Sequence, residues 1–358
     1  MKKLYLLFLV LGAAYTNVLA QNINCSQVLR LARSQYEQGR LHEMPALMEG
    51  CLNDKSGKGF TKEERREAYR LLTLAYIYLE EPEKADESML ALLNTDHFFQ
   101  INNSLDPAEF IALYNKFRHD PVYWLSLKFG VNVTQPSVSG NYYVGSHAAN
   151  AGKYALSPNI QLALAFEKDI LNKWLPNKLS VAPEVGYVAR SFGYSNPNLA
   201  LSDETSSPIS SQTFEFSQSW IDLNVMVNYK LRNTQNYKSY IGIGPGVSYL
   251  LSSTVQASTV LGNGFTVTGG SVIDKTSYKQ LVYSINAAIG AKLKFGDVYV
   301  LGEVRYQYGL NNIVDPAHRT NQEIAFDYQG QYNDTRLSNL SISIGVAYPY
   351  FKPKKLIK

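Results

Sequence analysis

Apolar and polar side chains alternate within residues 219–231, where every odd-numbered position from Ile221 to Leu231 is apolar and every even-numbered position from Asp222 to Lys230, apart from Met226, is polar or charged. Successive side chains of a strand point to opposite faces, so this stretch predicts a strand with one apolar and one polar face. Its length and regularity are typical of a strand between lipid and a polar lumen. A soluble β-sandwich also alternates, so the prediction depends on repetition along the chain.

The alternation recurs from Trp124 onward and predicts eight strands. They cover residues 124–133, 160–167, 179–190, 219–231, 240–251, 281–295, 298–309 and 340–351. Their connections alternate between long polar stretches, at 136–158, 195–214, 252–280 and 311–339, and short ones, at 170–178, 232–239 and 296–297. Outer-membrane barrels sort their loops in this way because tight turns face the periplasm and long loops face outward, whereas a soluble sandwich has no reason to do so.

The first twenty residues form a predicted signal peptide, with Lys2 and Lys3 before an apolar run and a small-residue cleavage site ending at Ala20. No later apolar run has the length of a transmembrane helix, so the exported protein is soluble or spans a membrane as a barrel. We therefore predict a signal peptide at 1–20, a periplasmic helical domain at 21–120, and an eight-stranded antiparallel transmembrane β-barrel with a basic tail at 121–358. The 26 tyrosines suit the aromatic girdles of such a barrel.

Residues 21–120 show helical periodicity and resemble tetratricopeptide repeats. The family's spacing is matched in a first copy by Val28, Leu31, Ala32, Tyr36 and Gly39, and in a second by Tyr69, Leu72, Tyr76, Ala85 and Asp96. Pro45, inside the second predicted helix, and His97, where the family prefers proline, depart from the pattern. A small helical bundle without a binding groove predicts the same periodicity, so both interpretations stay open.

Both cysteines lie in the helical segment, Cys25 near the start of its first predicted helix and Cys51 near the end of the second. Antiparallel packing brings these ends together, and an exported compartment is oxidising, so we expect a disulfide. No second cysteine or histidine sits at ligand spacing, and we predict neither a metal site nor a cofactor.

The polar faces of the predicted strands carry charges of both signs into the barrel lumen. These residues are Lys128, Glu167, Glu184, Arg190, Asp222, Lys230, Lys292, Glu303 and Arg305. Side chains fill the interior of an eight-stranded barrel, and buried charges must be paired. We therefore predict a salt-bridged plug in place of an open pore.

The last strand ends in residues 341–351, which resemble the terminal aromatic signal of outer-membrane barrels, although the basic tail at 352–358 departs from it. Together with the Gly-rich strands, in which Gly242, Gly244 and Gly246 share one face, residues 121–351 resemble the PorT-like outer-membrane β-barrel family. That resemblance implies a part in type nine secretion or gliding. A helical domain ahead of the barrel also resembles the domain order of envelope tethers.

The pattern favours a non-enzymatic outer-membrane anchor or scaffold whose helical domain binds a periplasmic protein partner of an envelope-spanning machine. Helical repeats bind through exposed side chains, and the candidates here are Arg66, Glu80, Glu83 and Lys84. The net charge of +4 gives no reason to expect nucleic acid, and no small-molecule substrate is evident.

An alternative is a barrel enzyme that acts on lipid or peptide at the cell surface, which needs a nucleophile–His or Asp–His set at the outer rim. Only His147 and His318 fall in the predicted outer loops, with Asp315 close to His318. Ser146 adjoins His147, but adjacent side chains of an extended segment point apart, and we predict no catalytic residue. A small channel or an adhesin is a further alternative, which the Ser-, Asn- and Gly-rich loops do not distinguish.

Overall fold

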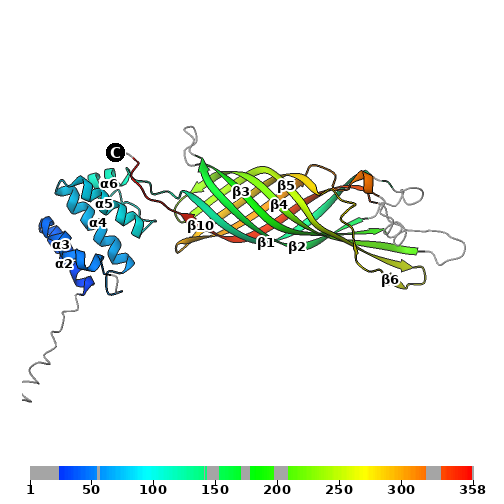
Figure 1. Cartoon of the computed structure of the whole chain (residues 1–358), viewed down its shortest axis with the longest axis horizontal. Coiled ribbons are helices and arrows are strands. Elements are labelled where there is room, and N and C mark those ends of the chain that lie inside the picture. The colour runs from blue at the N-terminus through cyan, green and yellow to red at the C-terminus, as the bar shows by residue number, and fades with distance from the viewer. Residues whose placement is uncertain are drawn as a thin grey trace, which may run out of the picture. The chain divides into compact units, whose positions relative to one another are not determined.

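The computed structural model describes residues 24–54, 57–140, 142, 153–170, 178–196, 209–319 and 332–356 (Figure 1). Contacts divide the chain into two compact units, one that runs to Asp120 and also contains the chain from Phe351 onward, and one that spans Pro121–Tyr350. Within the described residues, every helix is too short or too polar to cross a membrane.

The first unit is helical. Its elements are α2 (Cys25–Glu37), the 3-10 helix η1 (Leu41–Glu43), α3 (Met44–Leu52), α4 (Lys62–Tyr78), α5 (Pro82–Thr95) and α6 (Ala108–Tyr114). A capping box begins α4, in which Thr61 Oγ1 accepts from the Glu64 amide at 3.2 Å and Glu64 Oε2 accepts from the Thr61 amide at 3.0 Å. Ala32, Met44 and Ala68 are fully buried in the core that α2, α3 and α4 share.

Two details of the helical unit differ from the expected pattern. Leu31, predicted on the apolar face of the first helix, is 51% exposed, and Leu29 is buried instead. Pro45 does not interrupt the second helix, because η1 ends at Glu43 and proline then occupies the first turn of α3, where its missing amide hydrogen costs nothing. The likeness to tetratricopeptide repeats stays a prediction.

Cys25 and Cys51 form a disulfide across 26 residues of sequence. It joins the first residue of α2 to the last turn of α3, and both cysteines are buried in the core of these helices. In the chain-entropy model, closing a loop of this length stabilises the folded state by roughly 3 kcal/mol.

The C-terminal tail packs within the helical unit, although its place in the sequence grouped it with the barrel domain. The Phe351 ring stacks on His97 at 5.2 Å between centroids and meets Phe98 edge-on at 5.1 Å. The Arg118 amide donates to the Lys354 carbonyl at 2.9 Å, and Lys355 pairs with Asp86. The chain therefore passes between the two units twice, after Asp120 and after Tyr350.

The second unit is a closed β-barrel. Its strands are β1 (Tyr123–Gly140), β2 (Lys153–Ile170), β3 (Leu179–Asn196), β4 (Ile209–Asn233), β5 (Tyr237–Leu261), β8 (Leu281–Phe295), β9 (Val298–Gly309) and β10 (Asp334–Tyr350). Each of these eight pairs antiparallel with both neighbours, and β1 pairs with β10 from Tyr123↔Tyr350 onward to close the ring (Figure 1). The short strands β6 (Thr266–Thr268) and β7 (Val272–Ile273) pair with β5 only.

An apolar belt surrounds the barrel. Its members alternate along each strand with buried, lumen-facing residues, and many are about half exposed, such as Leu127 at 50%, Val131 at 51% and Leu223 at 53%. Tyr187, Tyr249, Tyr283, Tyr306 and Tyr308 mark the edge of the belt nearest the long loops. Tyr123 and Tyr350 stack at the opposite edge, beside the chain termini of the barrel.

Several strands are longer than predicted and extend into the stretches that were expected to be loops. β4 begins at Ile209 instead of residue 219, and β5 continues to Leu261. In these extensions Phe214 and Phe216 are buried inside, whereas Glu215 and Ser217 are exposed outside. The backbone hydrogen bonds between β4 and β5 continue beyond the belt, but there the inner face is apolar and the outer face is polar. The lipid-facing pattern therefore ends before the strand does.

Candidate functional site

A buried four-charge cluster lies in the middle of the barrel lumen. Lys128 Nζ, from β1, donates to Glu184 Oε2 at 2.6 Å and to Glu303 Oε2 at 3.0 Å. Arg305 Nη2, from β9, donates to Glu184 Oε2 at 2.9 Å and to Glu303 Oε1 at 2.7 Å. Each carboxylate thus contacts both cations, which is the pairing that a buried charge needs. The hydroxyl group of Tyr240, from β5, donates to Glu303 as well.

A second group of charges lies nearer the chain termini of the barrel. Glu167 accepts from Lys292 and, at 2.6 Å, from Ser180 Oγ. Lys292 Nζ also lies 4.8 Å from the ring centroid of Trp124, which is 3% exposed. Lys230 pairs with Asp169 at 2.6 Å. Aromatic rings and ion pairs together fill this end of the lumen.

A third group lies on the side of the long loops. Arg190 Nη2 donates to Asp222 Oδ2 at 2.6 Å and to Gln307 Oε1 at 2.9 Å. Its guanidinium carbon lies 5.3 Å from the ring centroid of Trp220, which is fully buried. Beyond Trp220 the interior becomes apolar, with Phe192, Phe216 and Tyr278 in one buried cluster.

All nine residues predicted in the lumen are buried there and paired. Asp169 also belongs to this network, because it pairs with Lys230. The predicted second strand ended at residue 167 and therefore left out Asp169, although Asp169 is two residues after Glu167 and lies on the same face of the strand. The cations are Lys128, Arg190, Lys230, Lys292 and Arg305, and the carboxylates are Glu167, Asp169, Glu184, Asp222 and Glu303. The two sets are equal in number, so the network is neutral when all are ionised.

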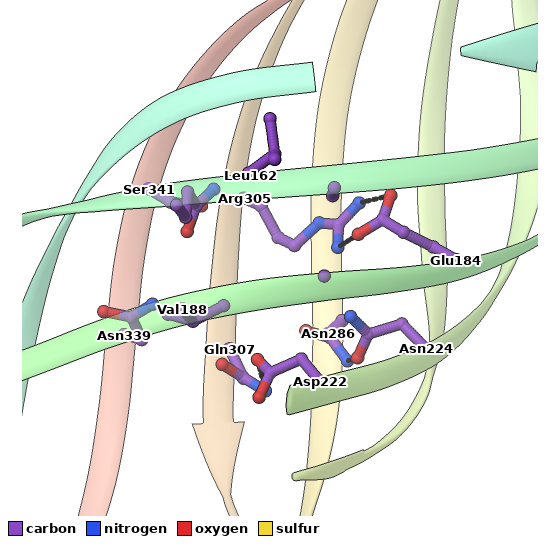
Figure 2. A pocket seen from close by; sticks show the side chains of 13 residues that line it. Leu162, Glu184, Val188, Asp222, Asn224, Asn286, Arg305, Gln307, Asn339 and Ser341 are labelled. Atoms are coloured by element: carbon purple, nitrogen blue, oxygen red, sulfur yellow. Dashed lines mark hydrogen bonds and ion pairs between the residues drawn. The ribbon is translucent and has the colours of Figure 1, made fainter. Parts of the chain in front are cut away.

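A small polar cavity of about 20 Å³ remains between the central cluster and the Arg190 group (Figure 2). Figure 2 shows the Arg305–Glu184 pair on one side and the Asn286–Asn224 and Gln307–Asp222 pairs on the other. Asp222 Oδ1 and Asn286 Oδ1 have no hydrogen-bond partner among the described residues. Because this volume holds about one water molecule, the cavity offers no room for a metabolite or a cofactor.

At the long-loop end of the barrel, buried polar residues form contacts that sequence patterns did not indicate. Asp274 is fully buried and accepts hydrogen bonds from the Tyr332 hydroxyl group and, at 2.7 Å, from Ser277 Oγ. Burial raises the pKa of the Tyr332 hydroxyl group. A buried aspartate between polar loop residues leaves no periodic signal, so only the fold brings these side chains together.

The histidines weighed for an enzyme do not assemble a catalytic set in the described residues. His318, the last residue of the short helix η3 (Pro316–His318), donates from Nδ1 to Oδ2 of its N-cap residue Asp315 at 3.0 Å, and the imidazole is 62% exposed. This hydrogen bond lowers the pKa of Asp315. Ser146 and His147 lie outside the described residues. No group of three or more His, Cys, Asp or Glu side chains that could hold a metal occurs among the residues searched, which are the described ones.

The four predicted partner-binding residues are exposed but do not form one patch. Glu80, Glu83 and Lys84 lie at the turn between α4 and α5, where Lys84 pairs with Glu81 at 2.6 Å. Arg66 lies at the other end of α4 and pairs with Asp96 at 3.4 Å. At 1.5 Å per residue, the twelve steps along the helix from Arg66 to Tyr78 span about 18 Å.

The family model described as "Outer membrane protein beta-barrel domain" matches residues 119–315. No curated protein matches the chain. Among solved structures, Neisserial surface protein A is 14% identical and aligns over 66% of this chain and 97% of its own, with a TM-score of 0.30. A major outer membrane protein from Thermus thermophilus is 14% identical over 63% of this chain and 99% of its own, with a TM-score of 0.32. The protease OmpT from Escherichia coli is 9% identical over 64% of this chain and 96% of its own, with a TM-score of 0.33.

Proposed function

This chain belongs to the outer membrane protein β-barrel domain family, and from that premise we propose that it is a non-enzymatic anchor whose helical unit binds a periplasmic protein. The filled lumen is the main observation that supports this proposal. Ion pairs, amide side chains and aromatic rings occupy the lumen from the Trp124 level to the Trp220 level, and the cavity between them holds about one water. A barrel of this kind holds a position in the membrane and passes no solute.

The orientation that we propose places the chain termini of the barrel in the periplasm. The turns on that side are short, with three residues between β4 and β5 and two between β8 and β9. Outer-membrane barrels keep tight turns on the periplasmic side and long loops outside. The chain enters the helical unit from this same end of the barrel, before β1 and after β10, which supports a periplasmic helical unit.

The surface that we propose for the partner is the turn between α4 and α5. Glu80, Glu83 and Glu87 are exposed there, and Glu81 neutralises Lys84, so the surface is acidic. A basic partner surface would complement it and would associate faster at low ionic strength. The resemblance to PorT-like barrels is what leads us to propose type nine secretion or gliding as the machine that supplies this partner.

Crosslinking in intact envelopes tests the anchor function. We expect Glu80→Lys combined with Glu83→Lys to lose a periplasmic protein that the wild-type chain captures, while the strain loses the function that deletion of the chain abolishes. Glu37→Lys combined with Glu109→Lys is the matched control, because both glutamates are exposed on the same unit and form no ion pair within the described residues.

Substitution of the two outer-loop histidines separates the anchor from a surface enzyme. His147→Ala combined with His318→Ala should complement a deletion strain, since neither side chain has a role in the anchor. Failure of this variant, together with full activity of the charge-reversed turn, would make a surface enzyme the better interpretation.

A further inference from the structure

A shallow concavity lies on the outside of the barrel at its long-loop end. Its lining includes Lys275, Lys279, Leu281, Asp315 and His318. Both lysines are partly buried, and neither forms an ion pair with any residue that the structure describes. Asp315 accepts a hydrogen bond from His318 and also attracts Lys279, so two lysines and one carboxylate leave the concavity with a net positive charge.

The concavity coincides with the edge of the apolar belt. Leu281 is the first residue of β8, is 49% exposed, and stands opposite Tyr249 of β5. Lys275 Nζ lies 5.7 Å from the ring centroid of Tyr249. Tyrosine rings mark the interface between the hydrocarbon and the headgroups of a bilayer, so Lys275 lies at the depth of lipid headgroups.

The backbone that carries the two lysines is fixed on both sides. The Lys279 amide donates to the Ile313 carbonyl at 2.7 Å, and the Asp315 amide donates to the Ser277 carbonyl at 2.9 Å. Ser277 is in turn hydrogen-bonded to the buried Asp274. A preorganised backbone lowers the entropy that a ligand must remove, which favours binding.

We infer that this concavity binds a phosphate group of a membrane lipid, with Lys275 and Lys279 at the phosphate and the acyl chains along Leu281 and the belt below it. A lysine ammonium is a compact charge that suits phosphate oxygens. The continuity with the belt favours a lipid over a soluble anion, because an acyl chain gains contact with Leu281 while the phosphate meets the lysines. The site is independent of the helical unit and would fix the barrel's depth and neighbours in the outer membrane.

Native mass spectrometry of the full-length mature protein in detergent tests this site. The probes are diphosphoryl lipid A and the same lipid after removal of both phosphates. We expect wild-type protein to prefer the phosphorylated form, and Lys275→Gln combined with Lys279→Gln to weaken that binding by roughly 20- to 30-fold, since each lysine near a charged lipid surface contributes about 1 kcal/mol.

The matched control is Lys153→Gln combined with Arg336→Gln, which removes two exposed cations from the same end of the barrel. We expect this control to bind the phosphorylated lipid within about twofold of wild type. Equal binding of both lipids by wild type, or equal loss in both double variants, would overturn the inference. Loss of the heat-stable band on gels would reveal a variant that fails to fold, and Lys275→Arg combined with Lys279→Arg, which keeps both charges, should then retain binding.

The choice of lipid A rests on the proposed orientation, because lipid A occupies the outward leaflet. Maleimide labelling of Asn263→Cys, on the long-loop side, and Asn236→Cys, on the short-turn side, tests that orientation independently. Labelling of Asn263→Cys alone in intact cells supports it, and labelling of Asn236→Cys alone contradicts it. A failure of the lipid site and a failure of the orientation are therefore distinguishable.

Discussion

The hydroxyl group of Tyr240 donates a 2.6 Å hydrogen bond to Glu303 Oε2, and both side chains are buried in the barrel lumen. Gly290, which pairs with Tyr240 across β5 and β8, leaves the space for the aromatic ring. A Cβ atom at Gly290 would lie 2.4 Å from the Tyr240 ring. Because Gly290 of β8 has no side chain, Tyr240 of the neighbouring strand β5 has room to form its hydrogen bond with Glu303. This hydrogen bond ties β5 to the four-charge cluster.

The Gly290→Ala variant should show how tightly this contact constrains the barrel. The added methyl group must displace the Tyr240 ring from Glu303, so we expect a loss of about 1–3 kcal/mol in the free energy of unfolding. The matched control is Gly302→Ala on the adjacent strand β9, where nothing lies within 4 Å of the added Cβ. The measurement is the temperature at which the folded band disappears on gels. Identical temperatures for the two variants would show that the lumen relaxes around the methyl group.

A second substitution removes a carboxylate from the central cluster. In Glu303→Ala, Lys128 and Arg305 keep only Glu184 as a partner, and Tyr240 loses its acceptor. Breaking a buried pair in this way costs about 3–5 kcal/mol. Asn263→Ala, in an exposed turn, should change stability by less than about 0.5 kcal/mol. Urea unfolding in detergent measures both, and equal midpoints would contradict the tight pairing that we describe.

Conductance tests the filled lumen directly. In planar bilayers the purified wild-type protein should show little or no steady current, because ion pairs and aromatic rings occupy the interior at every level. Trp220→Ala combined with Phe216→Ala, which opens the apolar cluster but leaves the ion pairs, should still conduct little. Large, stable wild-type channels would mean that the lumen opens in the membrane.

The prediction of a helical domain followed by an eight-stranded antiparallel barrel is confirmed, and the reason is physical. A lipid-facing strand must present an apolar side chain at every second position, so residues such as Ile221, Leu223 and Val225 reveal both the strand and its face. The same parity identified the lumen charges, because the even-numbered residues of β4, such as Asp222 and Lys230, have nowhere else to point.

Sequence patterns did not predict the regions of the barrel beyond the apolar belt, where strands no longer need an apolar side chain at every second position. Beyond the belt, Glu215 and Ser217 face water while Phe214 and Phe216 face inward, so polar and apolar positions exchange places and the strand resembles a loop. The contacts of Asp274 with Tyr332 and Ser277 bring together two loops with no periodicity at all. The sequence pattern also did not predict which exposed helical residues lie close together. Arg66 and Glu83 are near one another in sequence but are separated by most of the length of α4.

The pH dependence of the helical unit should depend on Glu64. Ser26 Oγ donates to Glu64 Oε1 at 2.5 Å and the Thr61 amide donates to Oε2 at 3.0 Å, and these hydrogen bonds hold the pKa of Glu64 below its usual value of 4.5. A carboxylate whose pKa is lower in the folded state stabilises the fold above pH 4.5, and this contribution is lost as pH falls through the lowered pKa. The first turn of α4 should therefore loosen in acid, since protonated Glu64 is a weaker acceptor and no longer interacts favourably with the helix dipole.

The measurement is amide hydrogen exchange at the start of α4 in the full-length protein, corrected for the intrinsic pH dependence of exchange. At pH 7 we expect faster exchange in Glu64→Gln than in wild type, because the variant lacks the charge that the hydrogen bonds stabilise. As the pH falls below 4.5 and through the lowered pKa of Glu64, the difference should shrink, since wild-type Glu64 then becomes neutral too. Glu63→Gln, one residue earlier in the same turn and exposed, is the matched control and should show no comparable convergence. A difference between Glu64→Gln and wild type that stays constant from pH 7 to pH 3 would show that Glu64 supports α4 through its shape and not through its charge.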